Sequence, residues 1–348
     1  MRIPPLYHTF QRYRTLMTDR ITALPIAILM PHSACNCRCV MCDIWKGNHN
    51  LRQLTQEDIE GLLTSLKKLG TRQVVMSGGE ALLNPAFFSL CAIFRQEGMK
   101  ITLLSTGLSL NRHAAHILKW VDELIVSLDG DEKLHDSIRN VPGAFHKLKE
   151  GVGLLHSLNP DFRITARTVI HRLNFRRWPA IVASAAAMGL QQVSFLPADV
   201  SSQAFNRAEP WDETRQLEIL PEKNELPLLR QILRQIIADN PACFETKFIA
   251  ESPAKLEKIG DYYEACYGLR PFPYKKCNAP WVSAVVEADG TVRPCFFHQS
   301  LGNIREAALS DIVNSAAAIH FRKTLDMDKD DTCRKCVCYL NLAPAAGL

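Results

Sequence analysis

The stretch CNCRCVMC, residues 35–42, places four cysteines within eight residues. The chain has 348 residues, twelve cysteines and a formal net charge of +5. Its first ten residues, MRIPPLYHTF, contain no apolar segment typical of a secretory signal, so we expect a reducing, cytoplasmic location. In such a compartment, clustered cysteines indicate metal binding or catalysis rather than disulfide bonds.

Apolar runs of strand length alternate with helical patterns on the carboxyl side of this stretch. We predict strands at 26–30, 73–79, 100–107, 123–130, 162–170 and 191–198, and helices at 55–69, 85–97, 110–120, 144–157 and 175–188. Near-continuous apolar strands that alternate with helices predict an α/β fold with a parallel sheet covered by helices. Six such units fit an open barrel or a doubly wound sheet, and periodicity alone does not decide between them.

Polar and glycine-rich residues follow consecutive predicted strands. The cysteine stretch follows the first strand, and the next three strands end in Gly78-Gly79-Glu80, in Ser105-Thr106-Gly107, and in Ser127 with Asp129-Gly130. In both candidate folds the functional residues lie at the carboxyl ends of the strands. The sequence therefore predicts one site along this edge of the sheet.

Three of the clustered cysteines, Cys35, Cys39 and Cys42, have the spacing C-x3-C-x2-C. Thiolate ligation of this kind suits iron–sulfur clusters and zinc. Three ligands to a cubane cluster leave one iron open, which suits chemistry rather than simple electron carriage. Cys37 breaks the spacing, so we expect it to point away from the cluster and not to bind it.

Together these motifs resemble the radical S-adenosylmethionine (radical SAM) superfamily, whose signature is C-x3-C-x2-C after the first strand of a partial barrel. The resemblance implies a partial (β/α)6 TIM barrel with a [4Fe-4S] cluster on the three cysteines. S-adenosyl-L-methionine would bind this cluster, and Gly78-Gly79-Glu80 resembles the motif that holds its methionine amino group. Glycines allow the backbone to approach closely, and the carboxylate offsets the ammonium charge.

The stretch SLDGDEKLHDSIR, residues 127–139, is similar to the equivalent part of superfamily members with SPASM or twitch extensions. The resemblance implies that Ser127 contacts the ribose and that Arg139 pairs with the methionine carboxylate. Met41 replaces the aromatic residue that often packs on adenine, and it can make a soft apolar contact instead. The full set expected to bind the cofactor is Met41, Gly78, Gly79, Glu80, Ser105, Thr106, Ser127, Asp129, Arg139 and Leu196.

A second cysteine group occupies the last fifth of the chain. Cys277 and Cys295 frame the pattern C-x12-G-x4-C around Gly290, and Cys333, Cys336 and Cys338 follow. This resembles a shortened SPASM domain, the twitch form, and implies a second, auxiliary [4Fe-4S] cluster on Cys277, Cys295, Cys333 and Cys336. The spacing leaves open whether Cys338 replaces Cys336, and a structural zinc ribbon is the alternative.

The resemblance covers residues 25–338 and implies a division into four regions. These are an N-terminal lead-in (1–24), the radical SAM partial barrel (25–215), a helical connector (216–265) and a small C-terminal iron–sulfur domain of SPASM/twitch type (266–348). The lead-in contains Arg2, Arg12, Arg14 and Arg20. We interpret it as a solvated, partly helical segment rather than a nucleic-acid contact, because the net positive charge is weak.

The resemblance implies an enzyme that cleaves S-adenosylmethionine reductively to a 5′-deoxyadenosyl radical, which abstracts a substrate hydrogen atom. We expect dehydrogenation or epimerisation of a small metabolite or natural-product intermediate. Peptide modification, radical decarboxylation and carbon–heteroatom transfer are the alternatives. Cys266 and Cys338 are candidate hydrogen-atom donors, and candidate substrate contacts are Tyr263, Arg270, Tyr274 and His298. A flavodoxin or ferredoxin would supply electrons, and we expect neither membrane nor nucleic acid as a partner.

Overall fold

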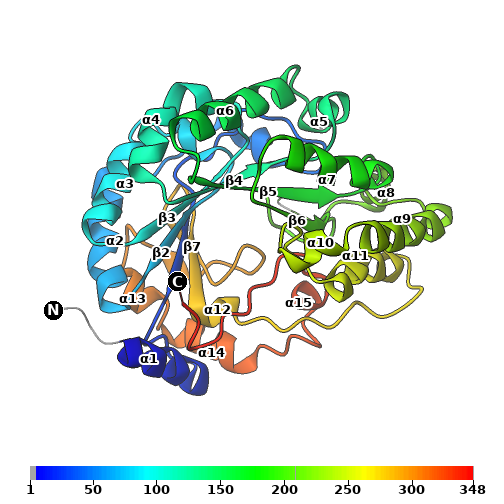
Figure 1. The fold of residues 1–348 in the computed structure, drawn as a ribbon. Helices are drawn as coiled ribbons and strands as arrows, with labels where there is room; N and C mark the ends of the chain where they lie inside the picture. Colours follow the sequence, from blue (N-terminus) through cyan, green and yellow to red (C-terminus); the bar gives the residue numbers. More distant parts are fainter. Residues whose placement is uncertain (1–4, 208, 348) are drawn as a thin grey trace.

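The computed structural model describes residues 5–207 and 209–347. Its sheet contains six parallel strands in chain order, with each strand hydrogen-bonded to the next, and the helices that connect them lie outside the curved sheet (Figure 1). This arrangement confirms the partial (β/α)6 barrel. The strands are β1 (Ile26–Leu29), β2 (Gln73–Met76), β3 (Lys100–Ser105), β4 (Glu123–Ser127), β5 (Arg163–Ile170) and β6 (Gln192–Pro197).

The predicted barrel helices are confirmed, with ends that shift by a few residues. They are α2 (Gln56–Lys68), α3 (Phe87–Gln96), α4 (Leu110–Trp120), α6 (Ala144–Leu158) and α7 (Trp178–Ala187), with short 3-10 helices η1 (Ile44–His49), η2 (Ala81–Leu83) and η3 (Phe175–Arg177). Helix α2 begins at Thr55, whose side chain forms a reciprocal capping box with Asp58. The sequence prediction missed α5 (Glu132–Arg139). The carboxylate of Asp131, the residue before this helix, caps its first turn.

Helix α1 (Pro5–Thr18) forms most of the described part of the lead-in. The guanidinium of Arg12 is buried and donates hydrogen bonds to Pro344 O (3.3 Å) and Ala346 O (2.7 Å). It therefore holds the C-terminal segment against α1. Arg2 lies outside the described residues.

A helical connector follows β6, as predicted, and leads to a region that extends the same sheet. The connector contains α8 (Glu213–Ile219), η4 (Lys223–Glu225), α9 (Leu226–Asp239), α10 (Pro241–Glu245) and α11 (Pro253–Cys266). The C-terminal region contains α12 (Ala279–Val282), β7 (Ser283–Val286), β8 (Thr291–Arg293), β9 (Gly302–Asn303), α13 (Leu309–Ile312), α14 (Ala316–Thr324) and α15 (Asp331–Lys335). In the described part of the chain, no helix is long and apolar enough to cross a membrane.

Strand β7 pairs with β1 in parallel, so the sheet runs continuously from the barrel into the C-terminal region. Strands β8 and β9 then add antiparallel to its edge. A hairpin turn at 287–290 joins β7 to β8, in which Gly290 N donates to Glu287 O at 2.9 Å and Gly290 has φ +89°. A positive φ here favours glycine.

Leu29, in β1, is fully buried between the strands that lead to the two cysteine groups. Replacing Leu29 with Ala removes buried methyl groups and leaves a cavity, so we expect the free energy of unfolding to fall by about 2–5 kcal/mol. Urea denaturation followed by circular dichroism measures this change. Leu158→Ala, at an exposed position on α6, is the matched control and should change stability by less than about 0.5 kcal/mol.

Candidate active site

The cysteine stretch 35–42 is held against the carboxyl end of α5. Arg38 N donates to Arg139 O and Val40 N donates to Ile138 O, both at 3.0 Å. These two bonds fix residues 38 and 40 against α5, and the Cys42 N–H then turns back to Cys39 O at 3.2 Å.

Cys37 does not point away from the other cysteines, which corrects our expectation. It is buried, its thiol makes hydrogen bonds with the thiols of Cys35 and Cys39, and its N–H lies 3.5 Å from Cys35 Sγ. The contact with Cys37 lowers the pKa of Cys39 to about 6.

The carboxylate of Glu80 is fully buried at the end of β2. It accepts hydrogen bonds from Ser105 Oγ (3.0 Å), Thr106 N (2.8 Å), Thr106 Oγ1 (2.7 Å) and Leu82 N (3.2 Å). Burial raises its pKa. Within the described residues no cationic side chain lies within 4.0 Å of this carboxylate, so a ligand ammonium fits the site.

Gly79 allows the Glu80 turn to contact the cysteine stretch directly. A Cβ atom at Gly79 would lie 2.2 Å from Ala34 O, and Glu80 N donates to Ala34 O at 2.9 Å. Gly78 has φ +111°, which favours glycine. The close backbone contact that these glycines permit is thus with the cysteine stretch, and their expected contact with the methionine amino group stays a prediction.

Asp129 and Arg139 form a buried ion pair beside the cysteines. Val169 N also donates to the Asp129 carboxylate at 3.1 Å, and Arg139 Nη1 lies 3.5 Å from Cys39 Sγ. Burial raises the pKa of Asp129, while Arg139 opposes this shift. The structure thus brings Arg139 to the cysteine cluster, and Met41 is buried in the same part of the core.

Ser127 and Leu196 lie on different strands from the residues around Glu80. Ser127 ends β4 and is the register partner of Arg167 in β5. Leu196 lies in β6 and lines a cavity rather than the group around Glu80 and Arg139. Leu196, which we predicted to bind the cofactor, therefore lines this neighbouring cavity of the barrel instead.

The C-terminal cysteines converge on one cavity. All twelve cysteines are described and all are free thiols, so no disulfide competes with metal binding. This cavity is lined by the four predicted ligands and one further cysteine, namely Cys277, Cys295, Cys333, Cys336 and Cys338. Five sulfurs exceed the four that a closed cluster needs, so the choice between Cys336 and Cys338 stays open.

His298 adds a nitrogen donor to this cysteine group. Its Nε2 atom lies 3.3 Å from Cys333 Sγ, and the ligand atoms of His298, Asp330 and Cys333 all lie within 4.8 Å of one another. Burial lowers the pKa of His298 and raises that of Cys295 to about 11. A ring N–H bonded to a cluster sulfur is one of the contacts that set the reduction potential of such clusters.

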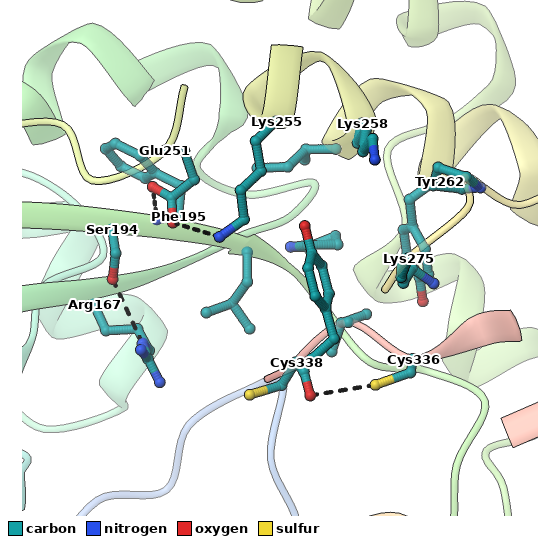
Figure 2. A pocket seen from close by; sticks show the side chains of 16 residues that line it. Arg167, Ser194, Phe195, Glu251, Lys255, Lys258, Tyr262, Lys275, Cys336 and Cys338 are labelled. Atoms are coloured by element: carbon teal, nitrogen blue, oxygen red, sulfur yellow. Dashed lines mark hydrogen bonds and ion pairs between the residues drawn. The ribbon is translucent and has the colours of Figure 1, made fainter. Parts of the chain in front are cut away.

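A larger cavity, which opens to solvent, lies between β5, β6, α11 and residues 336–339 (Figure 2). It shares four lining residues with the cysteine cavity, which are Lys275, Cys336, Cys338 and Tyr339. Figure 2 shows Cys336 and Cys338 at its lower edge and Arg167 on the opposite side from Lys258. The two cavities therefore adjoin through the C-terminal segment.

Several residues of the larger cavity were missed by the sequence prediction, because nothing local marks them. These are Arg167, Glu251, Lys255, Lys258 and Lys275. Cys266 lines neither cavity; its thiol contacts Tyr262, and burial raises its pKa to about 12. Tyr263 is buried and donates to Ile170 O, and Arg270 pairs with Asp261, so neither lines a cavity.

Iron content separates the cysteines that bind a cluster from those that only contact one. After anaerobic reconstitution we expect about eight irons per chain, falling to about four for Cys39→Ala and for Cys295→Ala. Cys37→Ala is the matched control, and we expect it to keep about eight irons because its spacing departs from the C-x3-C-x2-C pattern. A loss of about four irons in Cys37→Ala would make Cys37 a ligand.

Asp129→Ala leaves the buried guanidinium of Arg139 without its carboxylate. Breaking a buried ion pair in this way costs about 3–5 kcal/mol of unfolding free energy. Glu132→Ala, at an exposed position on α5, is the control and should change stability by less than about 0.5 kcal/mol. Equal stability of the two variants in urea denaturation would mean that the ion pair contributes nothing net.

Comparisons with known proteins match the two regions of the chain that contain these cysteine groups. Residues 29–184 match the model of the radical SAM superfamily, and residues 277–337 match the SPASM iron–sulfur cluster-binding domain. The chain is 25% identical over 336 residues to a protein of Methanosarcina barkeri named Fe-coproporphyrin III synthase, covering 90% of this chain and 80% of that one. It is 26% identical to the AdoMet-dependent heme synthase of the same organism, covering 85% and 83% of the two chains.

Solved structures support the fold. The structure of Streptococcus suis SuiB bound to S-adenosylmethionine matches with a TM-score of 0.65 and 14% identity, covering 97% of this chain and 78% of that one. The two family models assign to the chain a radical SAM domain, which binds S-adenosylmethionine and a [4Fe-4S] cluster, and a SPASM domain, which binds an auxiliary cluster. The chain belongs to the radical SAM superfamily and carries a C-terminal SPASM domain.

Proposed function

We propose that this enzyme oxidises a small-molecule substrate, which loses a hydrogen atom in the barrel and a further electron to the auxiliary cluster. The observation that carries the proposal is the larger cavity, which contacts both the barrel strands and the C-terminal cysteines. A substrate held there is next to Cys336 and Cys338, so an electron has a short path to the second cluster.

When bound, the cluster and S-adenosylmethionine supply a 5′-deoxyadenosyl radical, and the protein orients this chemistry. We assign Cys35, Cys39 and Cys42 to the radical-generating cluster. The Glu80 carboxylate accepts hydrogen bonds from the methionine ammonium, because it is buried, oriented and lacks a cationic partner within 4.0 Å among the described residues.

Three further assignments follow from the placement of the side chains. Gly78 and Gly79 let the Glu80 backbone lie against the cysteine stretch, and Ser105 and Thr106 fix the direction of the carboxylate. Arg139 binds the methionine carboxylate. Asp129 keeps the Arg139 guanidinium in place and offsets its charge in the low dielectric of the core.

We also propose the ligands of the second site that the sequence predicts. Cys277, Cys295 and Cys333 hold the auxiliary cluster together with Cys336 or Cys338. The adjoining His298 donates its ring N–H to Cys333 and favours the reduced cluster. The region boundaries at residues 24, 215 and 265 also stay a proposal, as does a flavodoxin or ferredoxin as electron donor.

The proposed oxidation balances with one hydrogen atom and one electron. Homolysis of a substrate C–H bond transfers the hydrogen atom and leaves a carbon radical. In dehydrogenation the radical loses a proton from the neighbouring atom and one electron, forming a double bond. In oxidative decarboxylation a carboxylate on the neighbouring carbon leaves as CO₂, and one electron again departs to the auxiliary cluster.

The relatives indicate where to look for the substrate. Two of them are named for making iron porphyrins, Fe-coproporphyrin III and heme, molecules that carry carboxylate side chains. A third is named PqqA peptide cyclase, from Streptomyces rochei, and the match covers 61% of that protein. The longer matches favour a carboxylate-bearing small molecule as the first class to test.

Epimerisation is a second candidate because of one residue. Cys338 is exposed and lines both cavities, so its thiol can return a hydrogen atom to a substrate radical. Cys266 lines neither cavity and is less suited to this role. Epimerisation in D₂O would place one deuterium in the product, whereas dehydrogenation would place none at the radical carbon.

The test of the proposed function separates hydrogen abstraction from electron removal. Reconstituted enzyme receives S-adenosylmethionine, dithionite and Fe-coproporphyrin III under anaerobic conditions, and 5′-deoxyadenosine and porphyrin products are measured by mass spectrometry. In Cys295→Ala we expect 5′-deoxyadenosine formation to continue while the oxidised product is lost, because the electron has no acceptor.

Cys39→Ala serves as the matched control and should lose both 5′-deoxyadenosine and product. Full product formation by Cys295→Ala would contradict a redox role for the second cluster. If wild-type enzyme forms no oxidised porphyrin although both clusters are present, Fe-coproporphyrin III is not its substrate.

A further inference from the structure

The charges around the larger cavity do not balance. Four cationic side chains line it, from Arg167, Lys255, Lys258 and Lys275, but only one carboxylate, from Glu251. Lys255 Nζ lies 3.7 Å from that carboxylate. Within the described residues no carboxylate lies within 4.0 Å of the other three cations, so the cavity holds a surplus of positive charge.

Arg167 presents its free donors to this space. Its Nε atom lies 3.5 Å from Ser194 Oγ, and this is the one hydrogen bond recorded for its side chain within the described residues. Both terminal nitrogens therefore remain available, and their fork geometry matches a carboxylate. Because Arg167 is the register partner of Ser127, an acid held here lies beside the candidate S-adenosylmethionine site.

Lys258 provides a second cationic position across the cavity. It lies on α11, three residues from Lys255 and on the same face, and its Nζ donates to Tyr274 O at 3.0 Å. Figure 2 shows it on the opposite side of the cavity from Arg167. A ligand that neutralises both positions must carry at least two separated anionic groups.

Lys275 has a different partner. It lines both cavities, its Nζ donates to Arg334 O at 2.7 Å, and burial lowers its pKa. Its charge lies near Cys333 and Cys336, so the thiolates of the auxiliary cluster offset it. The surplus left for a ligand is therefore at Arg167 and on the α11 face.

The remaining walls of the cavity are apolar. Leu196, Pro197, Ile259 and Val337 contribute aliphatic surface between the cationic positions, and Tyr339 contributes an aromatic ring. Such a lining suits a ligand with an apolar body and charged groups at its edge. Peptides or sugars without acidic groups would leave the cations uncompensated.

The geometry points to this cavity as the binding site for a polycarboxylate with an apolar body, anchored by Arg167 at one side and by Lys258 at the other. This inference rests on the proposed function, which it deepens by naming the substrate class and the anchoring residues. One carboxylate is held next to the radical site, which presents the neighbouring C–H bonds for abstraction.

Binding of iron-free coproporphyrin III to the reconstituted enzyme tests the inference by equilibrium dialysis. This probe has an apolar ring with four carboxylates and cannot coordinate thiolates through iron. Its tetramethyl ester has the same ring without charge and is the control ligand. We expect wild-type enzyme to bind the acid, more weakly as salt rises, and not to bind the ester.

Arg167→Met and Lys258→Met should each weaken binding of the acid about tenfold or more, because each removes a charged hydrogen bond. Lys223→Met, an exposed position on η4, makes the same charge change and should bind as the wild type does. Arg167→Lys keeps the charge without the fork and should have an intermediate affinity. Iron content equal to wild type shows that each variant is folded.

Three results would overturn the inference. These are no binding of the acid by wild-type enzyme, equal binding of acid and ester, or unchanged binding by both methionine variants. The alternative role of Arg167 is a contact with S-adenosylmethionine, and equilibrium dialysis of S-adenosylmethionine tests it. If Arg167→Met loses S-adenosylmethionine but keeps the porphyrin acid, Arg167 belongs to the cofactor site. Both dialysis experiments measure binding at equilibrium. Their results therefore do not depend on product formation by Cys295→Ala, which tests the proposed function.

Discussion

Strand β1 pairs in parallel with two strands that are far apart in the sequence. Leu29 is the register partner of Met76 in β2 and of Val286 in β7. Because parallel neighbours end at the same edge of a sheet, the chain segments that leave β1, β2 and β7 begin at the same height. The first segment carries Cys35 to Cys42, the second carries Glu80, and the third leads into the hairpin before Cys295. This one register therefore sets the relative positions of the first cysteine group, the Glu80 turn and the hairpin at 287–290, from which β8 runs back toward the other edge before Cys295.

Buried charge is the main energetic cost of the site. The Glu80 and Asp129 carboxylates and the Arg139 guanidinium are all removed from water. Desolvation of such groups costs several kcal/mol each unless hydrogen bonds and opposite charges compensate. Asp129 has both kinds of partner, whereas Glu80 has neutral donors and, within the described residues, no cation within 4.0 Å. In the proposed function a bound ammonium would complete the Glu80 site, and ligand binding would then be coupled to local stability.

The sequence predicted most of the barrel because its signals are local. Apolar strands and the glycines of 78–79 each leave a mark within a few residues. Helix α5 was missed because its eight residues carry no long apolar stripe, yet its carboxyl end positions the whole cysteine stretch. The error at Cys37 has a similar origin. The spacing of a motif does not show which way a side chain points. That direction depends on contacts with residues far away in the sequence, here Ile138 and Arg139.

The larger cavity could not be predicted, because its residues meet only through long-range pairing. Arg167 comes from a central strand, Lys258 from a connector helix and Cys338 from the final segment. In sequence each is an ordinary strand, helix or loop residue.

Lys275 links the two cavities physically as well as by position. It lies near Cys333 and Cys336, and it also lines the larger space. A cation beside cluster thiolates stabilises the reduced cluster, which carries one more negative charge than the oxidised one. The His298 contact with Cys333 acts in the same direction. In the proposed function, both contacts would raise the affinity of a cluster held by these cysteines for an electron, and an oxidation of the substrate would use such an acceptor.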